Sequence, residues 1–133
     1  MKSLTVYRCS CAAAIAFIVT LGLGTKFYID WIPFWIGDFI GDALYEIAWI
    51  WFFGALKIRW RVAVIAIAVF LTTSLIEFSQ LIAFPEPWTS QLWWRLLLGT
   101  HFAPADFLYY AIGSIFGAIS LGWLRKQTSQ SYP

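Results

Sequence analysis

Four apolar runs, each about as long as a helix that crosses a bilayer, take up most of this sequence and decide what it can fold into. A spanning helix needs about 20 predominantly apolar residues. The runs predict helices at about residues 6–23, 39–56, 62–84 and 104–124. Because 61% of the residues are hydrophobic and only 12% are charged, a water-soluble fold is strongly disfavoured. We therefore expect residues 1–133 to form one all-α domain, a four-helix transmembrane bundle.

The first run begins as a secretory signal peptide would, with Lys2 and Arg8 ahead of an apolar stretch. However, residues 22–25 lead directly into Lys26 and an aromatic segment, without an open loop that carries a small-residue cleavage site. We therefore expect an uncleaved first helix.

Two aromatic segments between the runs are predicted to lie at the membrane surface. Residues 24–38 mix charges with Trp and Phe, which suits an interfacial loop. Residues 88–103 contain Trp88, Trp93 and Trp94 around a short apolar stretch that is too short to cross the hydrocarbon core. An interfacial or re-entrant segment between helices 3 and 4 is therefore expected.

Basic residues fix the expected orientation. Four spans place both termini and the loop between helices 2 and 3 on one side of the membrane, whereas the opposite side carries only Lys26 and Arg95. The first side holds Lys2, Arg8, Lys57, Arg59, Arg61, Arg125 and Lys126. The positive-inside rule then predicts a protein of the cytoplasmic membrane with both termini in the cytoplasm.

This topology gathers polar residues from three helices and one loop in the outer half of the membrane. Two pairs share a helix face, one at i and i+4 on helix 2 and the other at i and i+3 on helix 3. The expected outward-facing polar pocket consists of Asp42, Glu46, Glu77, Gln80, Arg95, His101 and Asp106. Ionisable residues inside a membrane are costly, so they usually pair, line a cavity or serve a function.

Purely structural roles remain open for these residues. Asp42 and Asp106 suit the start of a helix, where the helix dipole favours acids. Glu77 and Glu46 are predicted to lie deeper, with Glu77 about two turns inside helix 3. Since no other outer cation is near, we expect Arg95 to contact Glu77 or Asp106, either as a structural ion pair or within a site.

Several function classes lack support in the sequence. The lone His101 has no second ligand at metal-binding spacing, and Cys9 and Cys11 match neither a metal site nor a disulfide framework. No metal or other cofactor is therefore expected. The net charge of +2 comes from scattered residues rather than a basic stripe, so a nucleic-acid partner is not expected.

The order of the polar and glycine residues is similar to a small bacterial membrane family catalogued as domain of unknown function 2809. The residues that carry this resemblance are Gly41, Asp42, Tyr45, Glu77, Gln80, Arg95, Leu98, Gly99, Phe102, Asp106, Tyr110 and Gly113. The Glu-x-x-Gln pair followed by Arg and Asp also resembles the VanZ-like proteins, which have four or five membrane helices and include one linked to glycopeptide resistance. The resemblance implies a membrane fold with Glu77, Gln80, Arg95 and Asp106 as a shared polar set, and it implies no particular reaction.

Three functions are compatible with these patterns. The first is binding of a lipid, or of a lipid-linked envelope precursor, through its headgroup in the outer polar pocket, with Arg95 on phosphate. The second is an accessory subunit of a larger membrane complex, or a homo-oligomer, that packs through the small-residue face of Gly113 and Gly117. The third is a membrane enzyme that acts on a lipid headgroup with Glu77 as its base.

Overall fold

The computed structural model describes residues 2–27, 31–82, 85–98 and 102–130, most of which are helical. These described residues form six helices: α1 (Lys2–Phe27), α2 (Phe34–Leu56), α3 (Val62–Ser79), α4 (Glu86–Thr89), α5 (Leu92–Leu98) and α6 (Pro104–Gln130). Four of them, α1, α2, α3 and α6, are long and apolar enough to cross a membrane. The prediction of an all-α bundle with four candidate spans is confirmed.

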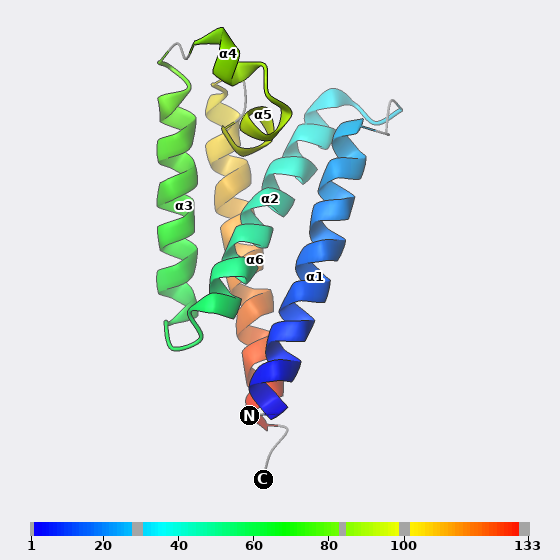
Figure 1. The fold of residues 1–133 in the computed structure, drawn as a ribbon, viewed down its shortest axis with the longest axis vertical. Helices are drawn as coiled ribbons and strands as arrows, with labels where there is room; N and C mark the ends of the chain where they lie inside the picture. Colours follow the sequence, from blue (N-terminus) through cyan, green and yellow to red (C-terminus); the bar gives the residue numbers. More distant parts are fainter. Residues whose placement is uncertain (1, 28–30, 83–84, 99–101, 131–133) are drawn as a thin grey trace.

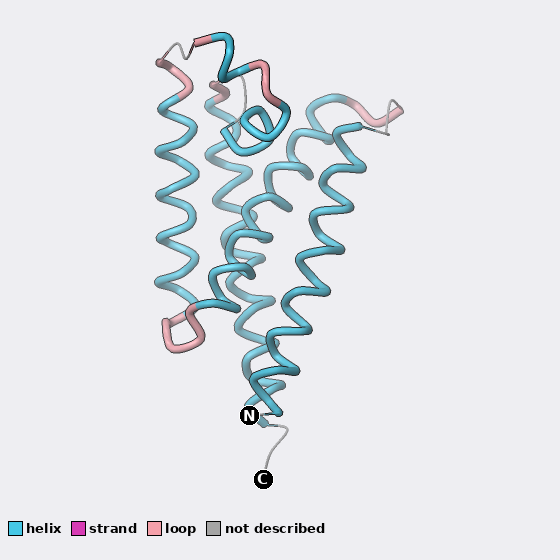
Figure 2. Tube along the Cα trace, in the orientation of Figure 1, coloured by secondary structure: helices cyan, strands magenta, loops and turns pink. Residues whose placement is uncertain are grey.

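The long helices lie side by side, with α4 and α5 across one end of the bundle (Figure 1). Helix α2 packs along α1 and along α6, whereas α3 packs mainly along α6. The loop between α2 and α3 lies toward the end where α1 begins and α6 finishes, and Figure 2 shows that the loops are confined to the two ends. We call this the basic end, because Lys57, Arg59, Arg61, Arg125 and Lys126 belong to it, and we call the opposite one the α5 end.

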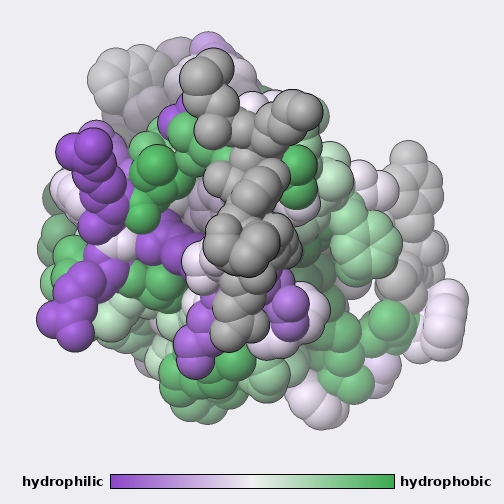
Figure 3. Space-filling view, turned by 90° about the horizontal axis from the view of Figure 1, so that it is seen from below, coloured by the Kyte–Doolittle hydropathy of each residue, from purple (hydrophilic) through white to green (hydrophobic). Residues whose placement is uncertain are grey.

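The outer surface of the bundle is apolar. The side chains of Phe17 on α1, Leu75 on α3 and Ile119 on α6 are 66%, 68% and 65% exposed. Seen from the basic end, hydrophilic side chains form separate patches among hydrophobic surface (Figure 3). Exposed apolar area on this scale suits hydrocarbon rather than water, so the surface agrees with the membrane assignment.

Helices α2 and α6 approach each other closely at two glycines. A Cβ atom added to Gly113 would lie 2.7 Å from the Ala43 carbonyl oxygen, and one added to Gly117 would lie 2.8 Å from Cδ1 of Ile50. Small residues allow this approach, and van der Waals contact between helices is a main source of stability inside a bilayer. The helix that packs on the predicted small-residue face is thus α2 of the same chain.

Helix α2 begins earlier than predicted. The expected loop over residues 24–38 is wrong in extent, because α1 continues to Phe27 and α2 starts at Phe34. Pro33 precedes the first turn with φ −52°, and its carbonyl accepts hydrogen bonds from Ile36 and Gly37. Proline suits this position because its missing N–H has no helical partner there. Asp42 consequently lies about two turns inside α2 rather than at its start.

Helix α3 ends earlier than predicted, at Ser79 rather than near residue 84. After Glu77 the backbone bonds tighten to i−3 spacing, from Gln80 N–H to Glu77 O at 3.1 Å and from Leu81 N–H to Phe78 O at 3.1 Å. Such 3₁₀ turns commonly close a helix, and Pro85 disfavours helical backbone just before it. Glu77 therefore lies in the last turn of α3, although its side chain is only 1% exposed.

Arg125 joins three helices at the basic end. Its guanidinium donates to the carbonyl oxygens of Gly54 at 3.1 Å and Trp60 at 2.6 Å, and to the Tyr7 hydroxyl at 3.1 Å. Tyr7 itself donates to Gly54 O at 2.9 Å. Carbonyls at a helix C-terminus lack helical partners and carry partial negative charge, so a cation satisfies them well. The sequence predicts only an orienting role for this arginine.

The close α2–α6 contact leads to a prediction about stability. Gly113→Ala would force a Cβ atom against the backbone of Ala43, and overpacking of this kind costs about 1–3 kcal/mol. We expect a lower unfolding temperature in detergent, measured by thermal-shift size-exclusion chromatography. Gly122→Ala on the same helix is the matched control, because no atom lies within 4 Å of its added Cβ. Equal stability of the two variants would contradict the close contact.

Candidate functional site

Glu46 is the most deeply buried acid in the described part of the chain. Its side chain is 0% exposed, and its Oε1 accepts a hydrogen bond of 2.7 Å from the Ser114 hydroxyl on α6. Its Oε2 has no hydrogen-bond partner among the described residues. The side chain of Thr73 on α3 also faces this carboxyl group. Glu46 therefore contributes a polar contact at the place where α2, α3 and α6 meet.

Glu77 accepts hydrogen bonds from three neutral donors. Its Oε1 accepts from the Ala103 backbone N–H at 2.8 Å, while its Oε2 accepts from Gln80 Nε2 at 3.1 Å and from the Tyr110 hydroxyl at 3.3 Å. Gln80 is one turn away on the chain, whereas Ala103 directly precedes α6 and Tyr110 lies in its second turn. These bonds fasten the end of α3 to the beginning of α6.

Tyr110 marks the point at which the acidic residues converge. The carboxyl groups of Asp42, Glu77 and Asp106 all lie close enough to its hydroxyl to interact with it electrostatically. They come from α2, α3 and α6, so the topology brings them together at the α5 end, as the sequence predicts. Glu46 and Ser114 lie one helical turn deeper than Asp42 and Tyr110. The polar residues thus occupy two successive levels of the bundle.

Arg95 is not among the partners of Glu77. It lies on α5 with an exposed side chain, and its backbone N–H bonds to Gln91 O at 3.1 Å. The expected contact of Arg95 with Glu77 is not found among the described hydrogen bonds, because neutral donors occupy that carboxylate, and its alternative contact with Asp106 stays a prediction. His101, the seventh member of the predicted pocket, lies outside the described residues.

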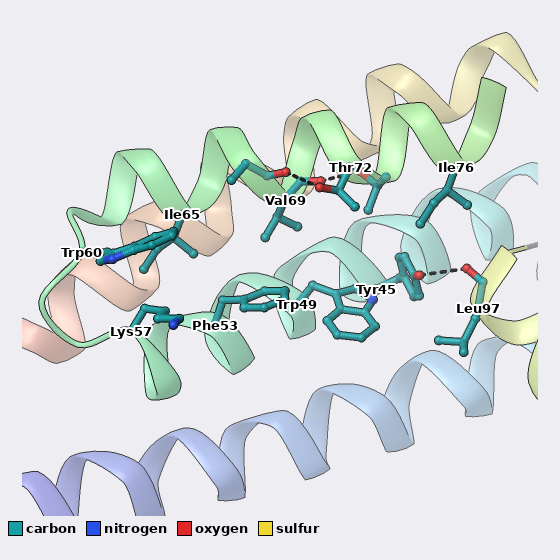
Figure 4. A pocket seen from close by; sticks show the side chains of 12 residues that line it. Tyr45, Trp49, Phe53, Lys57, Trp60, Ile65, Val69, Thr72, Ile76 and Leu97 are labelled. Atoms are coloured by element: carbon teal, nitrogen blue, oxygen red, sulfur yellow. Dashed lines mark hydrogen bonds between the residues drawn. The ribbon is translucent and has the colours of Figure 1, made fainter. Parts of the chain in front are cut away.

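A groove between α2 and α3 is a cavity that the sequence does not predict. It has a volume of about 400 Å³ and its walls are almost entirely apolar. Figure 4 shows side chains of α2 and α3 pointing toward each other across it. Its lining residues are Tyr45, Trp49, Phe53, Lys57, Trp60, Ile65, Ala68, Val69, Thr72, Thr73, Ile76 and Leu97. The six described residues of the predicted polar pocket are not among its lining residues.

The sequence does contain a signal for one wall of the groove. Tyr45, Trp49, Phe53 and Lys57 recur every four residues, which places them on one face of α2. Aromatic rings stack along this face, with the Trp49 and Phe53 centroids 5.8 Å apart. The signal is ambiguous, because the same spacing also describes a helix face packed against another helix. The position of α3 in the structure shows that this face of α2 borders a groove rather than a tightly packed helix.

Metal chemistry finds no support in the described residues, where no group of three or more His, Cys, Asp and Glu side chains is placed to hold an ion. Cys11 is buried in the core, while Cys9 is exposed, and both are free thiols. The polar residues of the bundle therefore offer hydrogen bonds and carboxylates rather than a ligand cage.

The hydrogen bonds of Glu77 lead to a prediction that separates the effect of its negative charge from that of its hydrogen bonds. Glu77→Gln keeps an oxygen for the Ala103 N–H, whereas Glu77→Leu leaves that donor unpaired, at a cost of about 1–3 kcal/mol. We expect Glu77→Gln to unfold near the wild-type temperature in detergent and Glu77→Leu to unfold well below it. If both variants lose stability equally, the negative charge itself holds α3 to α6.

Comparisons with known proteins agree with one of the two resemblances. No curated protein and no solved structure matches the chain. A family model matches residues 31–114, which run from just before α2 into the middle of α6. The matched segment includes Asp42, Glu77, Tyr110 and Gly113. The similarity to VanZ-like proteins stays a prediction. Because the match covers more than half of the 133 residues, the chain belongs to the family described as Protein of unknown function (DUF2809).

Proposed function

We propose that this chain is a lipid-binding protein of the cytoplasmic membrane and that a lipid tail lies in the groove between α2 and α3. The observation that carries the proposal is the groove itself, an apolar cavity of about 400 Å³ between two candidate membrane spans. Ligand sites in proteins commonly have about 300–1,000 Å³. A groove that borders the bilayer must be filled by hydrocarbon, because water there would lack hydrogen-bond partners.

The groove is a better candidate for the lipid than the polar cluster at the α5 end. Glu46 and Glu77 are 0% and 1% exposed, so a headgroup would have to part the helices to reach them. Their hydrogen bonds run between helices of this chain. We therefore assign both acids a role in holding the bundle together and assign lipid contact to the groove walls.

The polar groups of the groove walls suit an apolar occupant. Thr72 donates to Ala68 O at 2.7 Å, and Thr73 lies within hydrogen-bond distance of Val69 O at 3.1 Å. Both hydroxyls thus bond to carbonyls of their own helix, which is the usual arrangement for Thr inside a membrane helix. The walls then present methyl groups and aromatic rings, which favour dispersion contacts with a hydrocarbon chain.

A bulky side chain in the groove tests the proposal. Thr72→Trp projects into the groove, whereas Leu71→Trp places the same ring on a neighbouring residue that is exposed but not part of the lining. After extraction from membranes into mild detergent, native mass spectrometry counts the phospholipids retained by each variant. We expect the wild type and Leu71→Trp to retain phospholipid, and Thr72→Trp to retain about tenfold less, a loss of about 1.4 kcal/mol.

Two results would contradict lipid binding in the groove. One is retention by Thr72→Trp equal to that of the wild type. The other is a wild-type chain that retains no phospholipid, which would instead favour the accessory-subunit function.

The orientation in the membrane forms part of the proposal. The basic residues of the α2–α3 loop and of the end of α6 lie at the same end of the bundle, which supports a cytoplasmic position for this end. A cysteine introduced at Gln127, with Cys9 and Cys11 replaced by alanine, tests it. We expect an impermeant maleimide to modify this cysteine only after the cells are opened. Modification in intact cells would reverse the orientation.

A further inference from the structure

The groove between α2 and α3 has two unlike ends, and this difference bears on how a lipid would lie in it. At one end are Tyr45 and Leu97, and at the other are Lys57 and Trp60 (Figure 4). The Tyr45 hydroxyl donates to the Leu97 carbonyl oxygen at 3.0 Å, which joins α2 to α5 at this end of the groove. The opposite end carries Lys57, the one cationic side chain among the lining residues that the structure describes.

The dimensions of the groove fit a single hydrocarbon chain. Tyr45 and Lys57 are twelve residues apart along α2, which corresponds to about 18 Å at the helical rise. This length is close to the thickness of one leaflet, which is half of the roughly 30 Å hydrocarbon core. A groove of about 400 Å³ along this length can hold one hydrocarbon chain.

The Lys57 end is suited to a negatively charged headgroup. Lys57 lies over the Trp60 ring, with Nζ 5.6 Å from the ring centroid, and both side chains are exposed. Lysine and tryptophan are the residues that usually reach from a membrane helix to the level of the headgroups. Arg59 and Arg61 follow in the same loop with exposed side chains, but neither is among the described residues that line the groove.

Arg125 offsets the partial negative charge of backbone carbonyls that would otherwise repel an anion at this position. The C-terminus of α2 ends beside the groove, and its unpaired carbonyls would repel negative charge. Arg125 donates to the carbonyl oxygens of Gly54 and Lys57 and to that of Trp60 in the loop. Its guanidinium therefore offsets the negative end of the helix and also holds in place the backbone that carries Lys57 and Trp60.

We infer that the groove binds an anionic phospholipid of the leaflet at the basic end, with its phosphate at Lys57 and one tail running along Trp49 and Phe53 toward Tyr45. This inference rests on the proposed lipid-binding function and adds the headgroup class, the leaflet and the direction of the tail. It differs from an outward-facing headgroup site near Arg95, because Lys57 lies at the opposite end of the groove from Leu97 of α5.

The experiment compares two basic residues of the same loop. Lys57→Gln removes the charge at the end of the groove, whereas Arg59→Gln removes an exposed charge that does not line it. Each variant is reconstituted into vesicles of equal amounts of phosphatidylglycerol and phosphatidylcholine with identical tails, then extracted into detergent. Native mass spectrometry gives the ratio of the two retained lipids.

We expect the wild type and Arg59→Gln to retain phosphatidylglycerol in preference to phosphatidylcholine. For Lys57→Gln we expect this preference to fall about fivefold, the effect of one basic side chain near a membrane surface, with the total retained lipid unchanged. A preference that is unaltered in Lys57→Gln, or altered equally by Arg59→Gln, overturns the assignment of the phosphate to Lys57. Lipid binding itself would stand in that case, because it fails only if the wild type retains no phospholipid or if Thr72→Trp retains as much as the wild type.

Discussion

The contact between α2 and α6 determines where the other parts of the bundle lie. At Gly113 and Gly117 the two backbones are so close that a single added methyl group would meet Ala43 or Ile50. In a bilayer, apolar side chains gain little by leaving lipid for protein, so such close packing must supply much of the attraction between helices. The approach at Gly113 also brings Ser114 against Glu46. A packing contact and a polar contact thus reinforce each other on consecutive residues of α6.

The buried acids show how a small bundle accommodates carboxyl groups through neutral hydrogen-bond donors. The described hydrogen bonds to Glu46 and Glu77 come from a serine, a glutamine, a tyrosine and a backbone N–H. Arg125, by contrast, bonds to backbone carbonyls at the basic end. The two buried acids and Arg125 therefore join the helices at different levels of the bundle. The acids join α3 and α2 to α6, and Arg125 joins α1, α2 and α6.

Much of the fold could be predicted from the sequence, because the spans follow from the length of the apolar runs. The alternation of four spans also predicts that Asp42, Glu77 and Asp106 fall in the half of the bundle toward the α5 end. Helix ends were less accurate. Pro33 starts α2 before the apolar run begins, and 3₁₀ turns end α3 before the run stops. Hydrophobicity reports the membrane depth of a residue, whereas a helix starts and stops through local backbone geometry.

The partner of Glu77 and the groove could not be predicted, because both depend on distances between helices. Arg95 was the nearest cation by topology, yet a backbone N–H and two neutral side chains reach the carboxylate. The groove exists because α2 packs mainly along α1 and α6, while α3 packs mainly along α6. Because α3 packs mainly against α6, it stands away from the aromatic face of α2, and a cavity of about 400 Å³ remains between them. In water such a face would need another helix to cover it, whereas a bilayer offers a lipid tail to every exposed groove. The same closeness of α2 and α6 that stabilises the bundle therefore leaves open the surface to which we assign lipid binding.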